Sequence, residues 1–256
     1  MPIFIDSHCH LDAAEFNGQQ SVIVRKAEAA GVDTLVIPTI ERANFETVSA
    51  LCQHHSNCIP AYGIHPLYSD RATLADLDGL RDYLSQADAV AVGEIGLDFF
   101  VENYDRTVQE FYFSEQLKLA REFDLPVLLH TRRAVDVVLK HLRQIKVRGG
   151  IAHAFNGSRQ QAAEFIKLGF KLGFGGAMTY SRATSLRELA ATLPLDSLVL
   201  ETDAPDIPPS FLERGLPNRP EYLPRIAQTL ANLRGIPLEE IARVTSANTR
   251  SVLTKL

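Results

Sequence analysis

The stretch that decides the fold covers residues 3–12 and reads Ile3-Phe4-Ile5-Asp6-Ser7-His8-Cys9-His10-Leu11-Asp12. It places an apolar run of strand character directly before two histidines. Because side chains alternate between the two faces of a strand, we expect His8 and His10 on one face and Cys9 on the other, packed against surrounding helices. A dinucleotide-binding doubly wound sheet would carry a G-x-G-x-x-G loop after its first strand, and this turn carries His-Cys-His instead.

Seven further apolar segments of strand length follow, and amphipathic helical patterns separate most of them. They cover residues 33–37, 59–66, 89–94 running on to 98, 126–130, 150–153, 170–174 and 197–203. Strands that are apolar throughout and alternate with helices indicate a parallel sheet buried on both faces. Eight such units in 256 residues predict an α/β fold, a (β/α)₈ TIM barrel. No linker, repeat or low-complexity segment interrupts the chain, so we expect one domain over residues 1–256.

Local signals mark several of the helices. Residues 73–76 (Thr-Leu-Ala-Asp) and 158–161 (Ser-Arg-Gln-Gln) have the pattern of a capping box, which predicts a helix start at each site. Gly31 and Gly169 suit the position that follows the last turn of a helix. A long helix is expected over residues 107–123.

Composition excludes several classes of protein. Hydrophobic residues make up 46% and charged residues 22% of the chain, as in ordinary globular proteins. The net charge of -5 argues against broad, salt-dependent coating of nucleic acid, although a local pocket for one strand end is compatible with it. Three cysteines do not form a disulfide framework and are expected as reduced thiols. No signal peptide or membrane-spanning run is found, so a cytoplasmic location without membrane contact is expected.

Candidate metal ligands stand at the ends of predicted strands. They are His8, His10, Glu94, His130, His153 and Asp203. In a barrel the C-terminal ends of all strands meet at one rim, so these side chains are expected to converge. Each has another interpretation on its own, as a hydrogen-bonded turn histidine, a salt-bridged glutamate or a capping aspartate, but their joint occurrence favours one metal centre. His54, His55 and His141 fall within helical stretches, where we expect solvated surface positions.

The ligand set indicates two metal ions. Four imidazoles and two carboxylates exceed what one tetrahedral zinc ion accepts. They suit two divalent cations per chain that share a bridging carboxylate, and Glu94, central in strand order, is the expected bridge. Mixed nitrogen and oxygen ligands fit Mg²⁺, Mn²⁺, Zn²⁺ or Co²⁺ alike. Asp203 is the candidate general base that orients or deprotonates the nucleophilic water.

Motifs along the chain resemble those of the TatD-type metal-dependent deoxyribonucleases. They run in order from residue 3 to about 220: Asp6-Ser-His-Cys-His-Leu-Asp12, Gly63-Ile-His65-Pro66, Gly93-Glu-Ile-Gly-Leu-Asp98, His130-Thr-Arg132, His153-Ala-Phe-Asn-Gly-Ser158 and Glu201-Thr-Asp-Ala-Pro205. The resemblance implies a barrel of the amidohydrolase type, a two-metal site built from the same six ligands, and hydrolysis of DNA phosphodiesters from a 3′ end. It also implies that His65 contacts a substrate phosphate.

Other residues bear on the substrate. Arg132, Arg133, Arg159 and Arg182 follow strand ends, where guanidinium groups can clamp phosphates. Gly157-Ser158 at a helix N-terminus offers backbone N–H groups for the same purpose, so Ser158 joins His65 and Arg132 as a candidate substrate contact. Two positions depart from the family pattern: Asp206 stands where tyrosine is frequent, and Asn218-Arg-Pro220 replaces Asn-Glu-Pro. Both bear on substrate preference and leave the ligand set intact.

The sequence is therefore compatible with two enzymatic functions and disfavours a third, non-catalytic one. The first is a deoxyribonuclease that acts on a DNA 3′ end or another phosphoester. The second is a metal-dependent hydrolase of a non-nucleic ester, lactone, amide or aminoacyl-RNA bond, because the same hydroxide attacks a carbonyl as readily as a phosphorus. The acidic net charge and Asp206 favour the second. A non-catalytic binding protein is disfavoured because all six ligand positions are filled, and no protein partner is implied.

Overall fold

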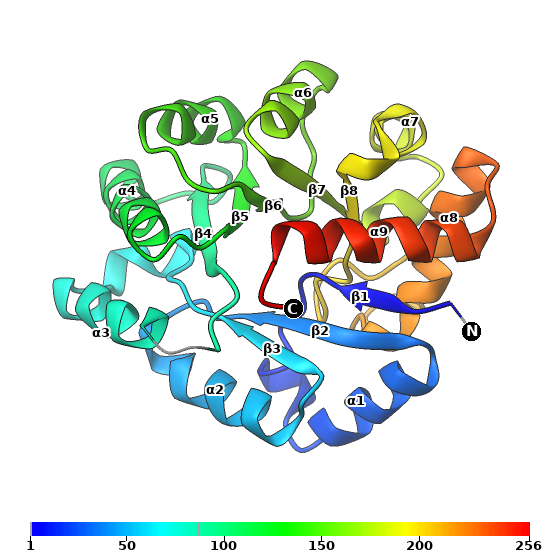
Figure 1. Ribbon diagram of the computed structural model, residues 1–256, viewed down its shortest axis with the longest axis horizontal. Helices are drawn as coiled ribbons and strands as arrows, with labels where there is room; N and C mark the ends of the chain where they lie inside the picture. Colours follow the sequence, from blue (N-terminus) through cyan, green and yellow to red (C-terminus); the bar gives the residue numbers. More distant parts are fainter. Residues whose placement is uncertain (1, 86–87) are drawn as a thin grey trace.

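The computed structural model describes residues 2–85 and 88–256. In these described ranges, eight parallel strands follow the order of the chain: β1 (Phe4–Asp6), β2 (Val32–Pro38), β3 (Cys58–Ala61), β4 (Val92–Asp98), β5 (Val127–Arg132), β6 (Gly150–Ala152), β7 (Phe170–Phe174) and β8 (Leu198–Leu200). Figure 1 shows the strands enclosed by a ring of helices, which confirms the predicted (β/α)₈ barrel. Within the described ranges, no helix combines the length and apolar character needed to cross a membrane.

Helices cover the outside of the barrel and close one of its ends. They are α1 (Gln20–Ala29), α2 (Phe45–His54), α3 (Leu74–Leu84), α4 (Arg106–Glu122), α5 (Val135–Gln144), α6 (Arg159–Lys167), α7 (Thr184–Thr192), α8 (Leu223–Arg234) and α9 (Leu238–Val252). Both predicted capping boxes are confirmed, at Thr73 before α3 and at Ser158 before α6. In Figure 1, α9 crosses one end of the barrel and brings the C-terminus to the middle of the ring.

The barrel closes through two irregular seams. Hydrogen-bonded ladders join β1-β2-β3 in one group and β4 to β8 in another. Single bridges then pair Tyr62 with Val92 at one seam and Cys9 with Ala204 at the other. The second seam lies beyond the last ladder residues of β1 and β8, so the turns that follow these two strands hold each other in place.

Alternation along the strands separates an inner core from an outer one. Val36, Leu128 and Val199 belong to an inner cluster with Val252 and Leu253, whereas their sequence neighbours pack outward against the helices. This is the period of two that a strand imposes on its side chains. The inner positions near the start of β2, β5, β6 and β8 are therefore apolar, and the same face continues toward the C-terminal rim.

Several predicted strands end earlier than the sequence indicated. β1 ends at Asp6, so His8 and His10 lie beyond the ladder. β3 ends at Ala61, and His65 instead precedes a 3₁₀ helix, Pro66–Arg71. The physical reason is that backbone groups at the rim bond to neighbouring turns rather than to a strand, as when His65 N donates to Ile40 O at 2.8 Å.

Candidate metal centre

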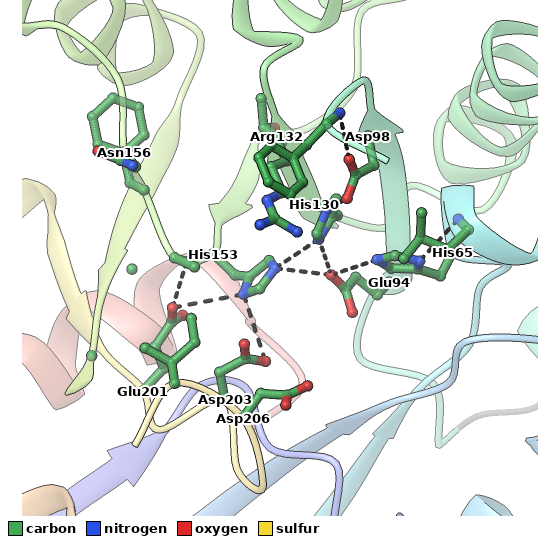
Figure 2. A pocket seen from close by; sticks show the side chains of 18 of the residues that line it. His65, Glu94, Asp98, His130, Arg132, His153, Asn156, Glu201, Asp203 and Asp206 are labelled. Carbon is green, nitrogen blue, oxygen red and sulfur yellow. Dashed lines mark hydrogen bonds and ion pairs between the residues drawn. The ribbon is translucent and has the colours of Figure 1, made fainter. Parts of the chain in front are cut away.

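The six candidate ligands form a cluster at the C-terminal rim: His8, His10, Glu94, His130, His153 and Asp203. Glu94, on β4, lies at the centre of this cluster. Its Oε1 lies 2.9 Å from His153 Nε2 and 3.0 Å from His130 Nδ1. Its Oε2 lies 3.2 Å from His8 Nε2 and 3.4 Å from His10 Nε2. Figure 2 shows Glu94 pointing toward His130 and His153. The two oxygens of one buried carboxylate thus face two different pairs of imidazoles, brought together from β5 and from the segments that directly follow β1 and β6.

Asp203 lies beside the first of these pairs. Its Oδ1 is 3.7 Å from both His8 Nε2 and His10 Nε2, and 3.9 Å from His153 Nδ1. Its backbone has a positive φ of 57°, which non-glycine residues rarely adopt. Asp203 N donates a hydrogen bond to His8 O at 2.9 Å, so the turn after β8 is fixed against the turn after β1.

The donor atoms fit divalent metal ions. Three groups of side chains each bring their ligand atoms within 4.8 Å of one another: His8, Glu94 and His153; His8, His10 and Asp203; His65, Glu94 and His130. Imidazole nitrogens also face each other, with 3.2 Å between His8 Nε2 and His10 Nε2 and 3.3 Å between His130 Nδ1 and His153 Nε2. Only one member of such a pair can donate a proton. Crowded imidazole and carboxylate donors of this kind are typical ligands of Zn²⁺, Mn²⁺ and Co²⁺.

Burial and neighbouring charges shift the pKa values of the cluster. Burial raises the pKa of Glu94, but the surrounding imidazoles outweigh it and hold the pKa well below its ordinary value. Burial lowers the pKa of His8 to about 3. Burial also acts to lower the pKa of His153, yet Glu94 and Asp203 raise it to about 10. For His10, burial is likewise opposed by Glu94, and the pKa is about 9. Glu94 and Asp203 thus favour positive charge at His10 and His153, as they would favour a bound cation.

Two carboxylates that the sequence analysis did not single out support the histidines. Asp98, the last residue of β4, places Oδ2 3.0 Å from His130 Nε2. Glu201, one residue beyond β8, accepts a hydrogen bond from Ala154 N at 2.5 Å and lies 3.7 Å from His153 Nδ1. Burial raises the pKa of Glu201 to about 8. The available signal was a carboxylate directly after an apolar strand, and both residues lie within the family motifs.

The two aspartates that flank His8 and His10 in the sequence fasten turns. Asp6 accepts hydrogen bonds from Thr202 N at 2.9 Å and from Thr202 Oγ1 at 2.6 Å. Asp12 accepts one from Asn44 Nδ2 at 2.7 Å. Asp6 therefore connects the end of β1 to the segment between Glu201 and Asp203.

A cavity of about 1330 Å³ opens over the cluster. Its lining includes His10, Glu94, His130, His153 and Asp203 from the cluster. Aromatic side chains form part of its wall: Tyr68, Phe99, Phe100 and Phe155. The volume is larger than the cluster alone requires, so a substrate can extend well beyond the reacting group.

The predicted substrate contacts fall in different places. His65 and Arg132 line the cavity, and Figure 2 places Arg132 next to His130. His65 Nε2 lies 3.5 Å from Glu94 Oε1, and its Nδ1 accepts a hydrogen bond from Leu67 N at 3.1 Å. Ser158 is not among the lining residues, and its Oγ accepts a hydrogen bond from Gln161 N as the cap of α6.

Two of the four candidate arginines also lie outside the cavity lining. Arg159 bonds to Thr192 on α7 at 2.5 Å, and Arg182 lies over the ring of Tyr180 at 5.2 Å. Arg133 lines the cavity together with Arg132.

One histidine outside the cluster lies where the sequence did not place it. His141 was predicted in a solvated position, but it is buried between α4 and α5. Its Nδ1 is 3.0 Å from Ser114 Oγ and its Nε2 is 3.1 Å from Glu110 Oε2. The prediction was wrong because this face of α5 packs against α4 and supplies polar partners for the ring. His54, by contrast, is exposed.

Comparison with known families agrees with this geometry. The family model described as TatD related DNase matches residues 5–254. The chain belongs to this family. The resemblance found in the motifs is therefore confirmed over nearly the whole chain.

Relatives of this TatD-family chain are similar to it along nearly their entire length. The uncharacterized metal-dependent hydrolase YjjV of Escherichia coli K12 is 43% identical, with 96% of each chain covered. Its crystal structure has a TM-score of 0.94 at 42% identity and 97% coverage of both chains. A protein of Klebsiella pneumoniae named 3′-5′ ssDNA/RNA exonuclease TatD is 32% identical, with 96% of each chain covered. An organophosphorus hydrolase variant from Deinococcus radiodurans shares the fold alone, with a TM-score of 0.65 at 15% identity, covering 98% of this chain and 92% of the other. The protein is thus a metal-dependent hydrolase of the TatD family.

The two departures from the TatD pattern lie differently. Asp206 lines the cavity, near Asp203 in Figure 2. Arg219 lies outside the lining, and its Nη2 donates to Gln19 Oε1 at 3.3 Å. Only Asp206 is therefore positioned to influence a bound substrate directly.

Proposed function

We propose that this chain is a divalent-metal-dependent deoxyribonuclease that hydrolyses phosphodiesters from the 3′ end of single-stranded DNA. The observation that carries the proposal is Glu94, whose two oxygens face separate imidazole pairs at 2.9–3.4 Å. A carboxylate in that position suits a bridge between two cations, the arrangement used for in-line displacement at phosphorus. The name of the Klebsiella relative supports a nucleic-acid substrate.

Each half of the cluster would hold one ion. His8, His10 and Asp203 with Glu94 Oε2 form one set, and His130 with His153 and Glu94 Oε1 form the other. When bound, such ions lower the pKa of a water molecule and neutralise charge that develops on the phosphate. The ligand chemistry suits Mn²⁺, Zn²⁺, Co²⁺ or Mg²⁺. Asp98 would fix the His130 ring, because it accepts a hydrogen bond from the nitrogen that faces away from Glu94.

Three side chains act on the attacking water or on the substrate in this proposal. Asp203 accepts the proton of the attacking water at a carboxylate oxygen. His65 donates a hydrogen bond to a phosphate oxygen. Its Nδ1 already accepts a hydrogen bond from Leu67 N, so the ring proton resides on Nε2. Burial lowers the pKa of His65 to about 4, which favours this neutral ring. Arg132 lies on the cavity wall near His130 and contacts the phosphate charge.

The proposal extends to the chain as a whole. Residues 1–256 act as one catalytic domain, and the three cysteines, all without a disulfide, suit a cytoplasmic enzyme. No protein partner is needed for the chemistry proposed, and Ser158 contributes by capping α6.

The test uses metal-stripped protein reloaded with each of the four cations. A 5′-labelled single-stranded oligonucleotide should be shortened one nucleotide at a time from its 3′ end. An oligonucleotide blocked at the 3′ end is the matched control and should remain intact. Release of acid from a panel of esters, lactones and aminoacyl-RNA with no shortening of DNA would contradict the proposal and establish the non-nucleic hydrolase.

A further inference from the structure

We propose that Phe100 and Arg133, with Arg132, form a binding site for the nucleotide adjoining the scissile phosphodiester of single-stranded nucleic acid. This inference rests on the proposed function, and it identifies what lies beyond the reacting phosphate. Phe100 follows β4, Arg132 is the last residue of β5 and Arg133 follows it, and all three line the cavity beside the candidate metal centre. We call them the Phe100 platform.

The platform combines an exposed aromatic ring with two guanidinium groups. Phe100 is 43% exposed, although it is a large apolar side chain. Arg132 Cζ lies 3.7 Å and Arg133 Cζ lies 4.6 Å from the centroid of its ring. In the described ranges neither guanidinium has a carboxylate within 4.0 Å or a side-chain hydrogen bond, unlike Arg106, which pairs with Glu110 at 2.7 Å nearby. Two arginines are thus held by an aromatic ring and keep their hydrogen-bond donors free.

The backbone presents both arginines to the same ring. Consecutive side chains of a strand point to opposite faces, so two adjacent arginines would normally diverge. Arg133, directly after β5, has a positive φ of 54°. Strain of this kind in a non-glycine residue persists where the surrounding structure holds it and is concentrated at functional sites. Here it accompanies the turn that brings Arg133 back to Phe100.

Asp98 connects the platform to the metal centre. Its Oδ1 accepts a hydrogen bond from Phe100 N at 2.8 Å, and its Oδ2 lies 3.0 Å from His130 Nε2. Phe99 N also donates to Arg132 O at 2.9 Å, which joins the two turns. The same carboxylate therefore bonds both a cluster histidine and the backbone that carries Phe100, so the platform is held in a defined place relative to the candidate metal ligands.

The chemistry of the platform suits single-stranded nucleic acid. Proteins bind single strands by stacking bases on aromatic or guanidinium planes while cations contact the backbone. A small ester offers neither a second phosphate nor a base to such a site. The two arginines also give an anionic ligand a local positive site in a chain whose net charge is -5.

The experiment measures binding and turnover separately. Binding of a 5′-fluorescent deca-thymidylate is followed by fluorescence anisotropy in Mn²⁺-loaded Asp203→Asn protein. Phe100→Ala and Arg133→Gln should each raise Kd about tenfold, and Phe100→Tyr should restore it. Arg133→Gln should also reduce the slope of log Kd against log salt by about 0.7, the value for one phosphate contact in a single strand. Arg225→Gln is the matched control, because Arg225 lies 3.7 Å over Phe211 outside the cavity lining.

Turnover is measured in protein that keeps Asp203, which is the parent for this comparison. The two substrates are the oligonucleotide and bis(p-nitrophenyl) phosphate, a diester without a base or a second phosphate. The ratio of the two kcat/KM values should fall about tenfold for Phe100→Ala and Arg133→Gln and remain constant for Arg225→Gln. An unchanged Kd, or a constant ratio in all variants, would overturn the platform while leaving the nuclease in place. Failure of the parent to hydrolyse either substrate would instead overturn the proposed function, and this inference with it.

Discussion

Near the start of the strands, the inward-facing residues Leu128, Ile151 and Val199 pack against Val252 and Leu253 at the end of α9. Two positions further along the chain stand His130 on β5, and His153 and Glu201 directly after β6 and β8. In these three segments the inward-facing side chains are therefore apolar at one end of the barrel and polar or charged two residues later. Residues that stabilise the barrel therefore lie at one end of its interior, and the candidate metal ligands lie at the other end.

The two ends also differ in strain. Of the six non-glycine residues with a positive φ in the described ranges, five lie in segments that follow strands at the cluster end: Asn103, Arg133, Ala154, Asp203 and Ile207. The sixth, Asp124, precedes β5 at the opposite end. Buried polar atoms without a hydrogen bond, such as Nδ1 of His8 and of His153, lie at the cluster end too. Each such feature costs stability, and the packed apolar end offsets the cost. Substitutions at the two ends should therefore have different consequences.

The largest effect is expected from Asp203→Asn at the cluster end. The change removes one charge and no volume, so kcat should fall about 10³-fold while the thermal unfolding midpoint changes little. Steady-state kinetics on the 5′-labelled oligonucleotide and circular dichroism provide the two measurements. Asp206→Asn is the matched control, since it makes the same change in the cavity wall and should affect kcat far less. Nearly full activity in the Asp203 variant would exclude this residue as the base.

The opposite end is tested by Leu253→Ala. Leu253 is fully buried in the inner cluster, and truncation of such a leucine lowers the free energy of unfolding by about 2–5 kcal/mol. Activity per folded molecule should be unchanged at moderate temperature. Chemical denaturation measures the loss, and Leu216→Ala, at a 51% exposed position, should show almost none. A loss of kcat without a loss of stability would contradict the division between the two ends.

A smaller effect is expected from Asp98→Asn. The amide can still accept from Phe100 N, but it interacts more weakly than a carboxylate with the His130 ring. Loss of such a supporting group typically weakens metal affinity about 10- to 100-fold. Titration of metal-stripped protein against a competing fluorescent chelator gives the affinity. Wild-type affinity in the variant would show that Asp98 does not support the site.

The smallest effect is expected on the outer surface, at Glu110→Gln. The hydrogen bond from Arg106 holds the pKa of Glu110 below its ordinary value, and His141 acts in the same direction. A lowered carboxyl pKa contributes stability above the pKa of the unfolded chain, and this is lost as pH falls through the folded value. The variant should therefore be less stable than wild type by under about 1 kcal/mol at pH 7 and equally stable near pH 3. Urea denaturation between pH 3 and pH 7 measures the free energy of unfolding of both proteins. A difference between them that persists at pH 3 would contradict this account.

The fold and most of the cluster could be predicted because both follow from periodicity. Eight apolar segments predicted the barrel, and the barrel predicted that His8 and Asp203, far apart in sequence, would meet. The faces were predicted as well: Cys9 is buried in the outer core, while His8 and His10 both approach Glu94.

Features that depend on tertiary packing could not be predicted. Whether His141 is solvated depends on how α5 packs against α4, which no local pattern encodes. The roles of Asp98 and Glu201 depend on contacts with rings from other strands. The ends of β3 and β8 depend on the irregular seams, where bonds between turns replace a ladder.

The central claim is that Glu94 joins two metal sites, and metal content tests it most directly. Wild-type protein and the Glu94→Gln variant are stripped, reloaded with excess Zn²⁺ or Mn²⁺, desalted and analysed by inductively coupled plasma mass spectrometry. The account predicts two ions per wild-type chain, and fewer than one in the variant, which stays folded by circular dichroism. One ion per wild-type chain, or two retained after loss of the Glu94 charge, would contradict the bridging role.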